Sequence, residues 1–343
     1  MRRRVASLLL LGASLALTRE AVASGLYFSD RGVRPMGRGG AFVAGADDLG
    51  SIWYNPAGLA DAGTSFLADF SWLRFSSEYT RRIKLLDADN TVRYVDSPRV
   101  NGSSPVIPFP TIAGSYAFGD KKQFTFAAGV YAPYVALATY PDTVNGVPSP
   151  ARYSLGSFDG SLLIIPGIWL AYKPIPSLRI GAGVQALTGI FQSTVVFSAS
   201  PQDRLLGAPE QPEFDASSQL RVGPIFAPSA NAGIIYEPER HIRFGASGQA
   251  PTIVSAPAKV HVRLPSDVAF DSAHVQGEDA HVRFELPAIL RVGVEVRPID
   301  RLRIELAYVR ELWTTHHSID ETSKNISING VTGLPPSVAL PPI

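Results

Sequence analysis

The sequence contains no cysteine among its 343 residues, which excludes a disulfide framework and a thiolate metal site. It also lacks an excess of charge, because 31 lysines and arginines stand against 30 aspartates and glutamates. That balance gives no reason to expect nucleic acid or a strongly acidic partner. Beyond the first residues no stretch is long and apolar enough for a transmembrane helix, so a helical membrane anchor is not predicted.

The N-terminal residues have the three parts of a secretory leader. Arg2–Arg4 are positively charged, Val5–Leu17 are apolar and uncharged, and Ala21–Ala23 form an A-x-A cleavage site. We therefore predict that residues 1–23 are a cleaved signal peptide and that the mature chain begins at Ser24. The protein would leave the cytoplasm.

Glycine and proline are plentiful, with 30 and 28 residues, and they divide the chain into short segments typical of β-strands. Within these segments apolar and polar residues alternate, most clearly over Val282–Val296. Strands of a soluble antiparallel sandwich also alternate, but they are usually about five or six residues long. A strand of a transmembrane barrel needs about ten residues. The length of the alternating segments favours the barrel.

The spacing of the predicted strands gives the stronger indication. We predict about nine strands, near residues 64–80, 110–118, 122–132, 158–173, 177–198, 219–237, 241–250, 281–297 and 301–313. Long links at 81–109, 133–157, 199–218 and 251–280 alternate with tight turns at 119–121, 174–176, 238–240 and 298–300. Outer-membrane barrels alternate long outer loops with short periplasmic turns in this way. The predicted fold class is therefore all-β, an antiparallel transmembrane β-barrel.

An odd number of strands leaves the predicted barrel open. Unpaired edge N–H and C=O groups cost several kcal/mol each in lipid, so an open sheet is not expected as a stable end state. The sequence also stops at Ile343 without a terminal aromatic strand. We therefore expect that residues 64–343 form an incomplete barrel, truncated on its C-terminal side.

A segment rich in small residues, Met36–Ala60, lies between the leader and the first predicted strand. We predict that residues 24–63 form a small helical hatch, a plug that the strands surround; the alternative is an N-terminal arm on a soluble domain. Asn55 and Pro56 are suited to a helix N-cap and to the first helical position. The other residues assigned to the hatch are Gly37, Gly39 and Gly40, expected to allow close backbone approach, and Asp47 and Asp48, expected to cap a second turn.

Three stretches carry a resemblance to a known family: Gly25–Asp61, Phe124–Tyr134 and, more weakly, Leu178–Leu187. The first contains a gapped pattern formed by Gly37, Gly39, Ala41, Ala46, Asp47, Asp48, Asn55, Pro56 and Ala57. In these stretches the sequence resembles the FadL/TodX family of outer-membrane transporters for long-chain fatty acids and aromatic hydrocarbons. The resemblance extends to about Val309 and implies a FadL-like barrel of fourteen strands in full, of which about nine are present. It also implies the outer membrane of a Gram-negative bacterium.

The resemblance implies a function as well, the passive transport of hydrophobic compounds without a cofactor. A ligand would be captured at the outer loops, pass to an apolar pocket beside the hatch, and leave sideways through a gap at a kinked third strand. Here that strand is Gln123–Ala132, and Gly129 and Pro133 are expected to break its ladder, although Pro133 alternatively ends the strand. The residues expected to line the pocket, unless they serve ordinary packing, are Leu26, Tyr27, Phe28, Phe109, Tyr131 and Tyr134. The expected partners are the hydrophobic ligand, outer-membrane lipid with lipopolysaccharide, and the barrel-assembly machinery.

Two other classes of function remain open from the sequence. An outer-membrane hydrolase of lipase or esterase type could use Ser154 or Ser161 with His241 or His261, although no spacing recommends these pairs. A structural barrel or an adhesin would act through its long loops and would not need a hatch. No metal site is predicted, because His241, His261 and His281 fit strand segments with one polar face, and His316 and His317 lie in a predicted loop without a carboxylate pattern.

Overall fold

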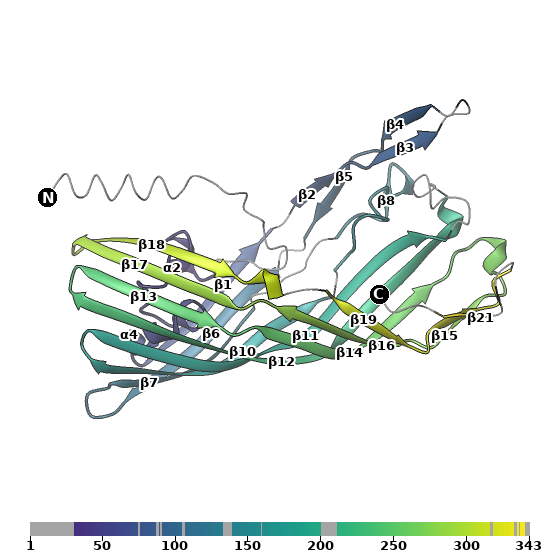
Figure 1. The fold of residues 1–343 in the computed structure, drawn as a ribbon. Helices are drawn as coiled ribbons and strands as arrows, with labels where there is room; N and C mark the ends of the chain where they lie inside the picture. The colour runs from purple at the N-terminus through teal and green to yellow at the C-terminus, as the bar shows by residue number, and fades with distance from the viewer. Residues whose placement is uncertain are drawn as a thin grey trace.

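Antiparallel β-strands dominate the structure (Figure 1). The computed structural model describes residues 31–74, 76–86, 89, 91–104, 107–132, 139–158, 160–199, 211–315, 318–332, 335 and 337–339. The strands of the largest sheet are β1 (Ser65–Leu73), β6 (Ile107–Phe118), β7 (Phe124–Tyr131), β10 (Leu162–Ile175), β11 (Leu178–Ser198), β12 (Asp215–Glu239), β13 (Ile242–Gln249), β14 (Thr252–Arg263), β16 (Asp279–Leu286), β17 (Ile289–Ile299), β18 (Leu302–Glu311) and β19 (Asp320–Lys324). None of the helices in this part of the chain is long and apolar enough to cross a membrane.

The strands of this sheet pair in the order β1-β6-β7-β10-β11-β12-β13-β17-β18. Off this path, β14 pairs with β12 and β16, and β16 also pairs with β19. β13 continues past Pro251 as β14, and β17 is preceded by β16 across Pro287. The two pairs of strands keep the same partners on both sides of the interruption. Proline has no N–H to donate to a ladder, so both strands are interrupted at the same level of the sheet.

The links at the two ends of the sheet differ in length, as the sequence predicts. The turns β6–β7, β10–β11, β12–β13 and β17–β18 are short and lie together at one end (Figure 1). The opposite end carries the long links. These links contain the small pairs β2 (Ser76–Tyr79) with β5 (Val100–Ser103), β3 (Arg82–Leu86) with β4 (Val92–Asp96), and β8 (Thr143–Val144) with β9 (Val147–Pro148), and the 3-10 turns η2 (Pro212–Phe214), η3 (Val268–Phe270) and η4 (Trp313–Thr315). They also contain β15 (His274–Gln276), which forms a small sheet with β20 (Ser327–Asn329) and β21 (Ser337–Ala339) from the segment after β19.

Three predicted strand boundaries are wrong. The first predicted strand, 64–80, ends at Leu73 in the main sheet, and its remainder forms β2, which pairs with β5 instead. The predicted strand 281–297 is two strands separated at Pro287. The predicted link 251–280 begins with the twelve residues of β14, because the interruption at Pro251 resembles a strand end when only the sequence is read.

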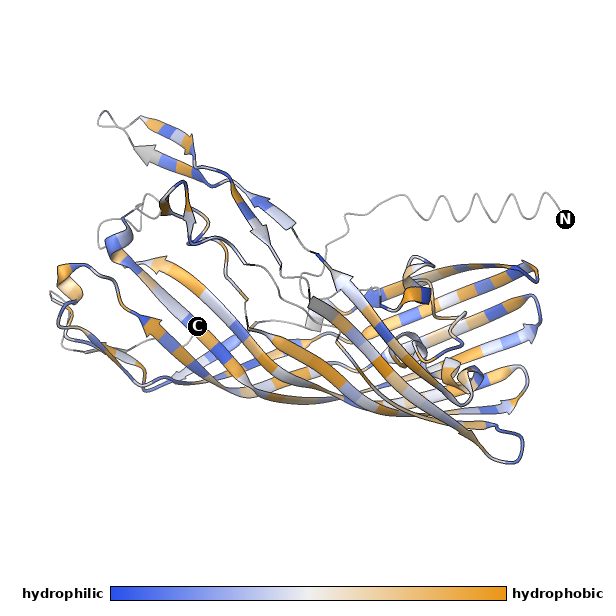
Figure 2. Cartoon of the chain, turned by 180° about the vertical axis from the view of Figure 1, so that it is seen from behind, coloured by the Kyte–Doolittle hydropathy of each residue, from blue (hydrophilic) through white to orange (hydrophobic). Residues whose placement is uncertain are grey.

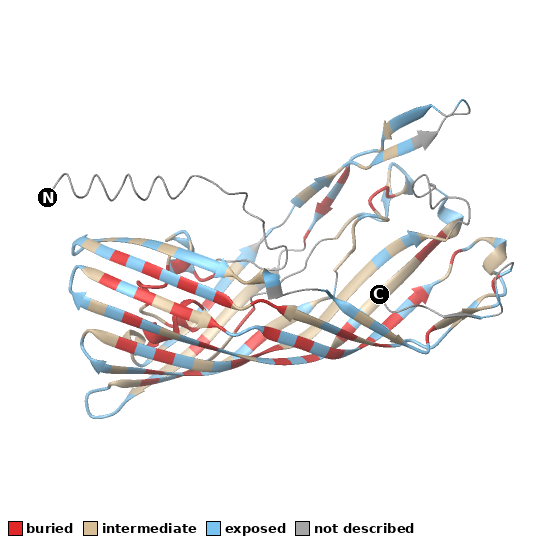
Figure 3. Ribbon diagram, in the orientation of Figure 1, coloured by how far each residue is buried: buried red, intermediate tan, exposed pale blue. Residues whose placement is uncertain are grey.

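Hydrophobic and hydrophilic residues alternate along the strands, and so do exposed and buried ones (Figures 2 and 3). The exposed set contains many large apolar side chains, and the buried set includes charged ones. Phe66, Phe226 and Leu306 are 74%, 74% and 71% exposed. Arg243 of β13 and Glu295 of β17, which are paired in register, are buried. This is the pattern of a sheet that faces lipid outside and a polar lumen inside. A soluble sandwich would leave the same apolar side chains in water, so that alternative is wrong.

The N-terminal segment folds into single helical turns that lie against the inner face of the sheet near the short turns (Figure 1). They are α2 (Val33–Met36), α3 (Ser51–Tyr54), η1 (Pro56–Gly58) and α4 (Leu59–Ala62). Gly39 and Gly40 have φ values of 60° and 78°, which side chains rarely adopt. Since a Cβ on Gly39 would meet nothing within 4 Å, the turn after α2 requires glycine there for its dihedral angle rather than for the expected close approach. We call the described part of this segment, residues 31–63, the hatch.

The backbone of the hatch lies directly against Gly181 of β11, where an added Cβ would collide with the backbone of Pro56. Because backbone atoms cannot turn aside, we expect Gly181→Ala to lower the free energy of unfolding by about 1–3 kcal/mol and to expose the hatch to protease. Gly114→Ala is the matched control, since a Cβ on this β6 glycine meets nothing within 4 Å. Equal thermal stability and protease resistance of the two variants would contradict the close contact.

Candidate functional site

The side chain of Asn55 connects two parts of the hatch with each other and with the sheet. Its side-chain oxygen accepts the N–H of Ala57 at 3.2 Å, which caps η1 with Pro56 in the first position, as the sequence predicts. Its amide nitrogen donates to the carbonyl of Val43 at 2.8 Å and to that of Ile234 in β12 at 3.2 Å. The side chain is fully buried. Asn55 therefore satisfies backbone groups of two hatch turns and one strand at once.

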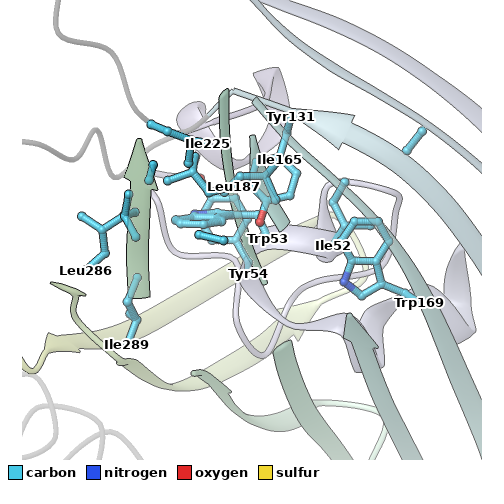
Figure 4. Close-up of a cluster of buried hydrophobic side chains, with 14 of the residues drawn as sticks. Ile52, Trp53, Tyr54, Tyr131, Ile165, Trp169, Leu187, Ile225, Leu286 and Ile289 are labelled. Carbon is cyan, nitrogen blue, oxygen red and sulfur yellow. The ribbon is translucent and has the colours of Figure 1, made fainter. Parts of the chain in front are cut away.

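An aromatic cluster fills the space between the hatch and the sheet (Figure 4). The rings of Trp53 in the hatch and Tyr131 at the end of β7 meet edge to face, with centroids 5.4 Å apart. The Tyr131 hydroxyl donates to Gln185 at 2.7 Å. On the other side of the hatch, Trp169 of β10 donates its indole N–H to Asn231 at 3.0 Å, and Asn231 donates to the carbonyl of the hatch residue Ile52 at 2.8 Å.

One carboxylate of the hatch, that of Asp61, is surrounded by cations from the sheet. Lys173 of β10, Arg179 of β11 and Arg243 of β13 lie 3.0, 2.8 and 3.2 Å from its oxygens. Burial alone would raise the pKa of Asp61, but Arg179, Lys173 and Arg243 hold it below its usual range. Three strands thus anchor the C-terminal end of the hatch.

A second anchor holds the N-terminal half of the hatch to β17 and β18. Glu305 accepts the backbone N–H groups of Val43, Ala44 and Gly45 at 2.8, 2.8 and 3.1 Å. Arg38 of the hatch bridges Glu305 and Glu295 at 2.7 and 2.6 Å. These side-chain carboxylates are 1% and 0% exposed, so their attraction to Arg38 is little weakened by water.

The other predicted caps of the hatch form ion pairs. Asp47 lies 2.8 Å from Arg34 and 2.7 Å from Arg303 of β18, so it pairs with arginines rather than capping a turn. Asp48 accepts the N–H of Gly50 at 2.8 Å, immediately before α3, and also pairs with Arg34. Asp47 therefore ties the hatch to β18, whereas these contacts of Asp48 lie within the hatch.

A cavity of about 340 Å³ lies between the hatch and β1, a volume within the range of about 300–1,000 Å³ typical of ligand pockets. Its wall is mostly apolar and aromatic, with a few polar side chains. The lining residues are Arg31, Gly32, Val33, Arg34, Pro35, Asp48, Gly50, Trp53, Tyr54, Leu67, Ala68, Asp69, Phe70, Thr111 and Tyr131.

The end of β7 lies beside this cavity. β7 pairs with β6 and β10 without a register shift through Gly129 to Tyr131, so the ladder break expected at Gly129 is not found there. Past that point, the described residues of β6 pair with β1, and those of β10 with β11. Pro110 of β6 and Pro166 of β10 flank the end of β7 and have no N–H to donate.

The structure brings together only part of the predicted pocket. Tyr131 lines the cavity, whereas Phe109 lies on β6 outside its lining. The remaining predicted pocket residues, Leu26, Tyr27, Phe28 and Tyr134, and the predicted kink residue Pro133 lie outside the described residues. Sequence reasoning missed the two ionic anchors and the cavity residues Trp53, Leu67 and Asp69. The ionic anchors could have been inferred from charged residues at inward-facing strand positions, because an unpaired charge there is costly in a membrane protein.

An antiparallel sheet that faces lipid and encloses an ionically anchored hatch defines a class of protein, the plugged outer-membrane β-barrel. The family model "Outer membrane protein transport protein (OMPP1/FadL/TodX)" matches residues 14–332, and the chain belongs to this family. No curated protein matches the chain significantly.

Solved structures agree in fold. The chain is similar to a Pseudomonas aeruginosa FadL homologue, with 14% identity and a TM-score of 0.61 over 89% of this chain and 76% of that one. It is also similar to the Ralstonia pickettii toluene transporter TbuX, with 19% identity and a TM-score of 0.55 over 91% and 79% of the two chains. The P. putida toluene transporter TodX matches with 17% identity and a TM-score of 0.55 over 91% and 76%.

The contacts of Glu305 with the hatch predict the effect of one substitution. In Glu305→Gln the amide nitrogen faces N–H groups that need an acceptor, so we expect the free energy of hatch unfolding to fall by about 3 kcal/mol. Hydrogen exchange at Val43, Ala44 and Gly45 measures this. Glu239→Gln, at an exposed carboxylate by a short turn, is the control. Unchanged exchange in Glu305→Gln would show that Glu305 does not anchor the hatch.

Proposed function

We propose that the protein carries apolar small molecules passively across the outer membrane, through the cavity beside the hatch and then sideways into the lipid. The observation that supports this most is the position of the cavity. Aromatic and aliphatic side chains line it, and Tyr131 places it at the end of β7. No cofactor and no energy source are needed for movement down a gradient.

Burial energetics favour this route for an apolar molecule. Transfer out of water contributes about 0.8 kcal/mol per CH₂, so a water-filled pore offers such a molecule nothing. An apolar cavity offers burial, and the lipid outside the sheet offers it again. The hatch, held by Asp61 on one side and by Glu305 on the other, acts as a fixed floor that closes the lumen toward the short turns.

The exit fits the end of β7 better than it fits Gly129. Opening a ladder costs less where donors are already missing, and Pro110 and Pro166 remove them on both sides of β7. We expect Pro133 to add to this effect, as the family resemblance implies. The ligand would then pass between β6 and β10, close to Tyr131.

The ligand class follows by analogy with the family. Two of the similar structures are named toluene transporters and a third is a FadL homologue, which supports aromatic hydrocarbons or long-chain fatty acids as ligands. We propose that a cleaved leader exports the chain, that the barrel-assembly machinery inserts it, and that lipopolysaccharide surrounds its outer end. The inner wall of the cavity would provide the binding site.

The hydrolase alternative finds no support in the described residues. Ser161 donates to the carbonyl of Gln192 next to a long link, while His241 contacts the carbonyl of Arg297 at the opposite, short-turn end. A nucleophile and its base must lie within hydrogen-bond reach. His261 is on the exposed face of β14, paired in register with Gln219.

Filling the cavity tests the proposal. In Leu67→Trp a larger side chain occupies the space beside Trp53 and Tyr54, and we expect toluene and oleate uptake to fall by about tenfold or more. Uptake is measured in cells that express the full chain. Phe66→Trp, one position away on the lipid side, is the matched control and keeps full uptake.

Heat-modifiable migration in gels shows that both variants are folded and inserted. Equal uptake by the two variants would contradict the cavity route. Turnover of an ester by the purified protein would instead support the hydrolase.

A further inference from the structure

One wall of the cavity carries a carboxylate. Asp69 of β1 is 8% exposed and lines the cavity. Its Oδ2 atom accepts the N–H of Val33 at 2.7 Å. Its Oδ1 atom is buried and has no hydrogen-bond partner among the described residues. A buried acceptor without a donor costs about 1–3 kcal/mol, so such an atom in a ligand cavity marks where a donor belongs.

The other charged groups of the wall are already engaged. Arg31 donates to the carbonyl of Ala132 at 2.6 Å and lies over the ring of Trp53. Arg34 pairs with Asp48 at 2.5 Å and with Asp47 at 2.8 Å. Around the cavity, within the part of the chain that the structure describes, each guanidinium therefore has an acceptor.

We propose that the cavity selects neutral aromatic molecules that carry one hydroxyl group, which donates to Asp69 Oδ1. The inference rests on the proposed function and names the ligand class of the same cavity. Trp53, Tyr54 and Tyr131 provide aromatic surface for the ring, and Val33 and Leu67 provide aliphatic surface. An alkylphenol matches this wall at both its apolar and its polar end.

Asp69 also discriminates against two related classes. A hydrocarbon of the same shape has no hydroxyl and leaves Oδ1 without a donor. A site with a buried polar group binds such an analogue more weakly than the ligand that pairs with the group. A carboxylate ligand brings a second negative charge beside Asp69, and like charges at short range repel. The expected order of affinity is therefore phenol, then hydrocarbon, then carboxylate.

Three probes of one shape test this order: 4-methylphenol, toluene and 4-methylbenzoate. Calorimetric titration of the purified full chain in detergent should give at least tenfold tighter binding of 4-methylphenol than of toluene, and the weakest binding for 4-methylbenzoate. Asp69→Leu should remove the advantage of 4-methylphenol, which loses its acceptor, and should tighten toluene binding, because no buried oxygen is then left without a donor.

Asp69→Asn keeps an acceptor for Val33 and puts an amide N–H in the place of Oδ1. This variant should prefer 4-methylacetophenone, which offers only an acceptor, over 4-methylphenol by at least tenfold. A structural role of Asp69 through Val33 alone would not reverse a preference between donor and acceptor ligands.

Equal affinity of the unchanged protein for toluene and 4-methylphenol would overturn the inference, and so would loss of all ligands in both variants. If no probe binds while the full chain still takes up toluene and Leu67→Trp blocks that uptake, the inference fails and the proposed function stands. If neither binding nor uptake occurs, the proposed function fails with it.

Discussion

Lipid against the outer face of the sheet is the constraint on which the rest of this structure depends. A charged side chain cannot face the hydrocarbon cheaply, so the charges of the strands near the short turns point inward. There they need partners, and the hatch supplies them. Asp61 neutralises cations of β10, β11 and β13, while Arg38 joins the carboxylates of β17 and β18. The same contacts satisfy hatch backbone that no helix or strand would otherwise pair, most clearly at Val43, Ala44 and Gly45.

These contacts between the hatch and the sheet explain why the hatch can consist of single helical turns. Helices this short are not stable alone, because forming the first turn is costly and few bonds follow it. Buried contacts with Asn55, Trp53 and the two ionic anchors replace the missing helical length. A hatch held so firmly on several strands is suited to closing the lumen permanently, as the proposed sideways exit requires.

The sequence predicts the architecture well and the site poorly, for physical reasons. Alternation and link lengths are local signals, so strand order, turn positions and the cap at Asn55 can be read from it. The strand boundaries at Pro251 and Pro287 could not be predicted, because a proline occurs both where a strand ends and where a strand is only interrupted. The site depends on pairs such as Glu305 with Val43, which are far apart in the chain and meet only when the sheet curves around the hatch. Asp69 could be placed on the inner face by alternation, but its unpaired oxygen is a property of the packing.

The central claim is that the hatch is a fixed floor, and a reversible lock tests it directly. The chain has no cysteine, so Val43→Cys with Gly293→Cys introduces one defined pair. A Cβ on Gly293 would lie 3.1 Å from that of Val43, slightly closer than the usual Cβ separation of about 3.5–4.5 Å in a disulfide. We expect toluene uptake to be the same in the oxidised and the reduced protein, because the ligand does not pass the hatch. Uptake that stops on oxidation and returns on reduction would show that the hatch must move.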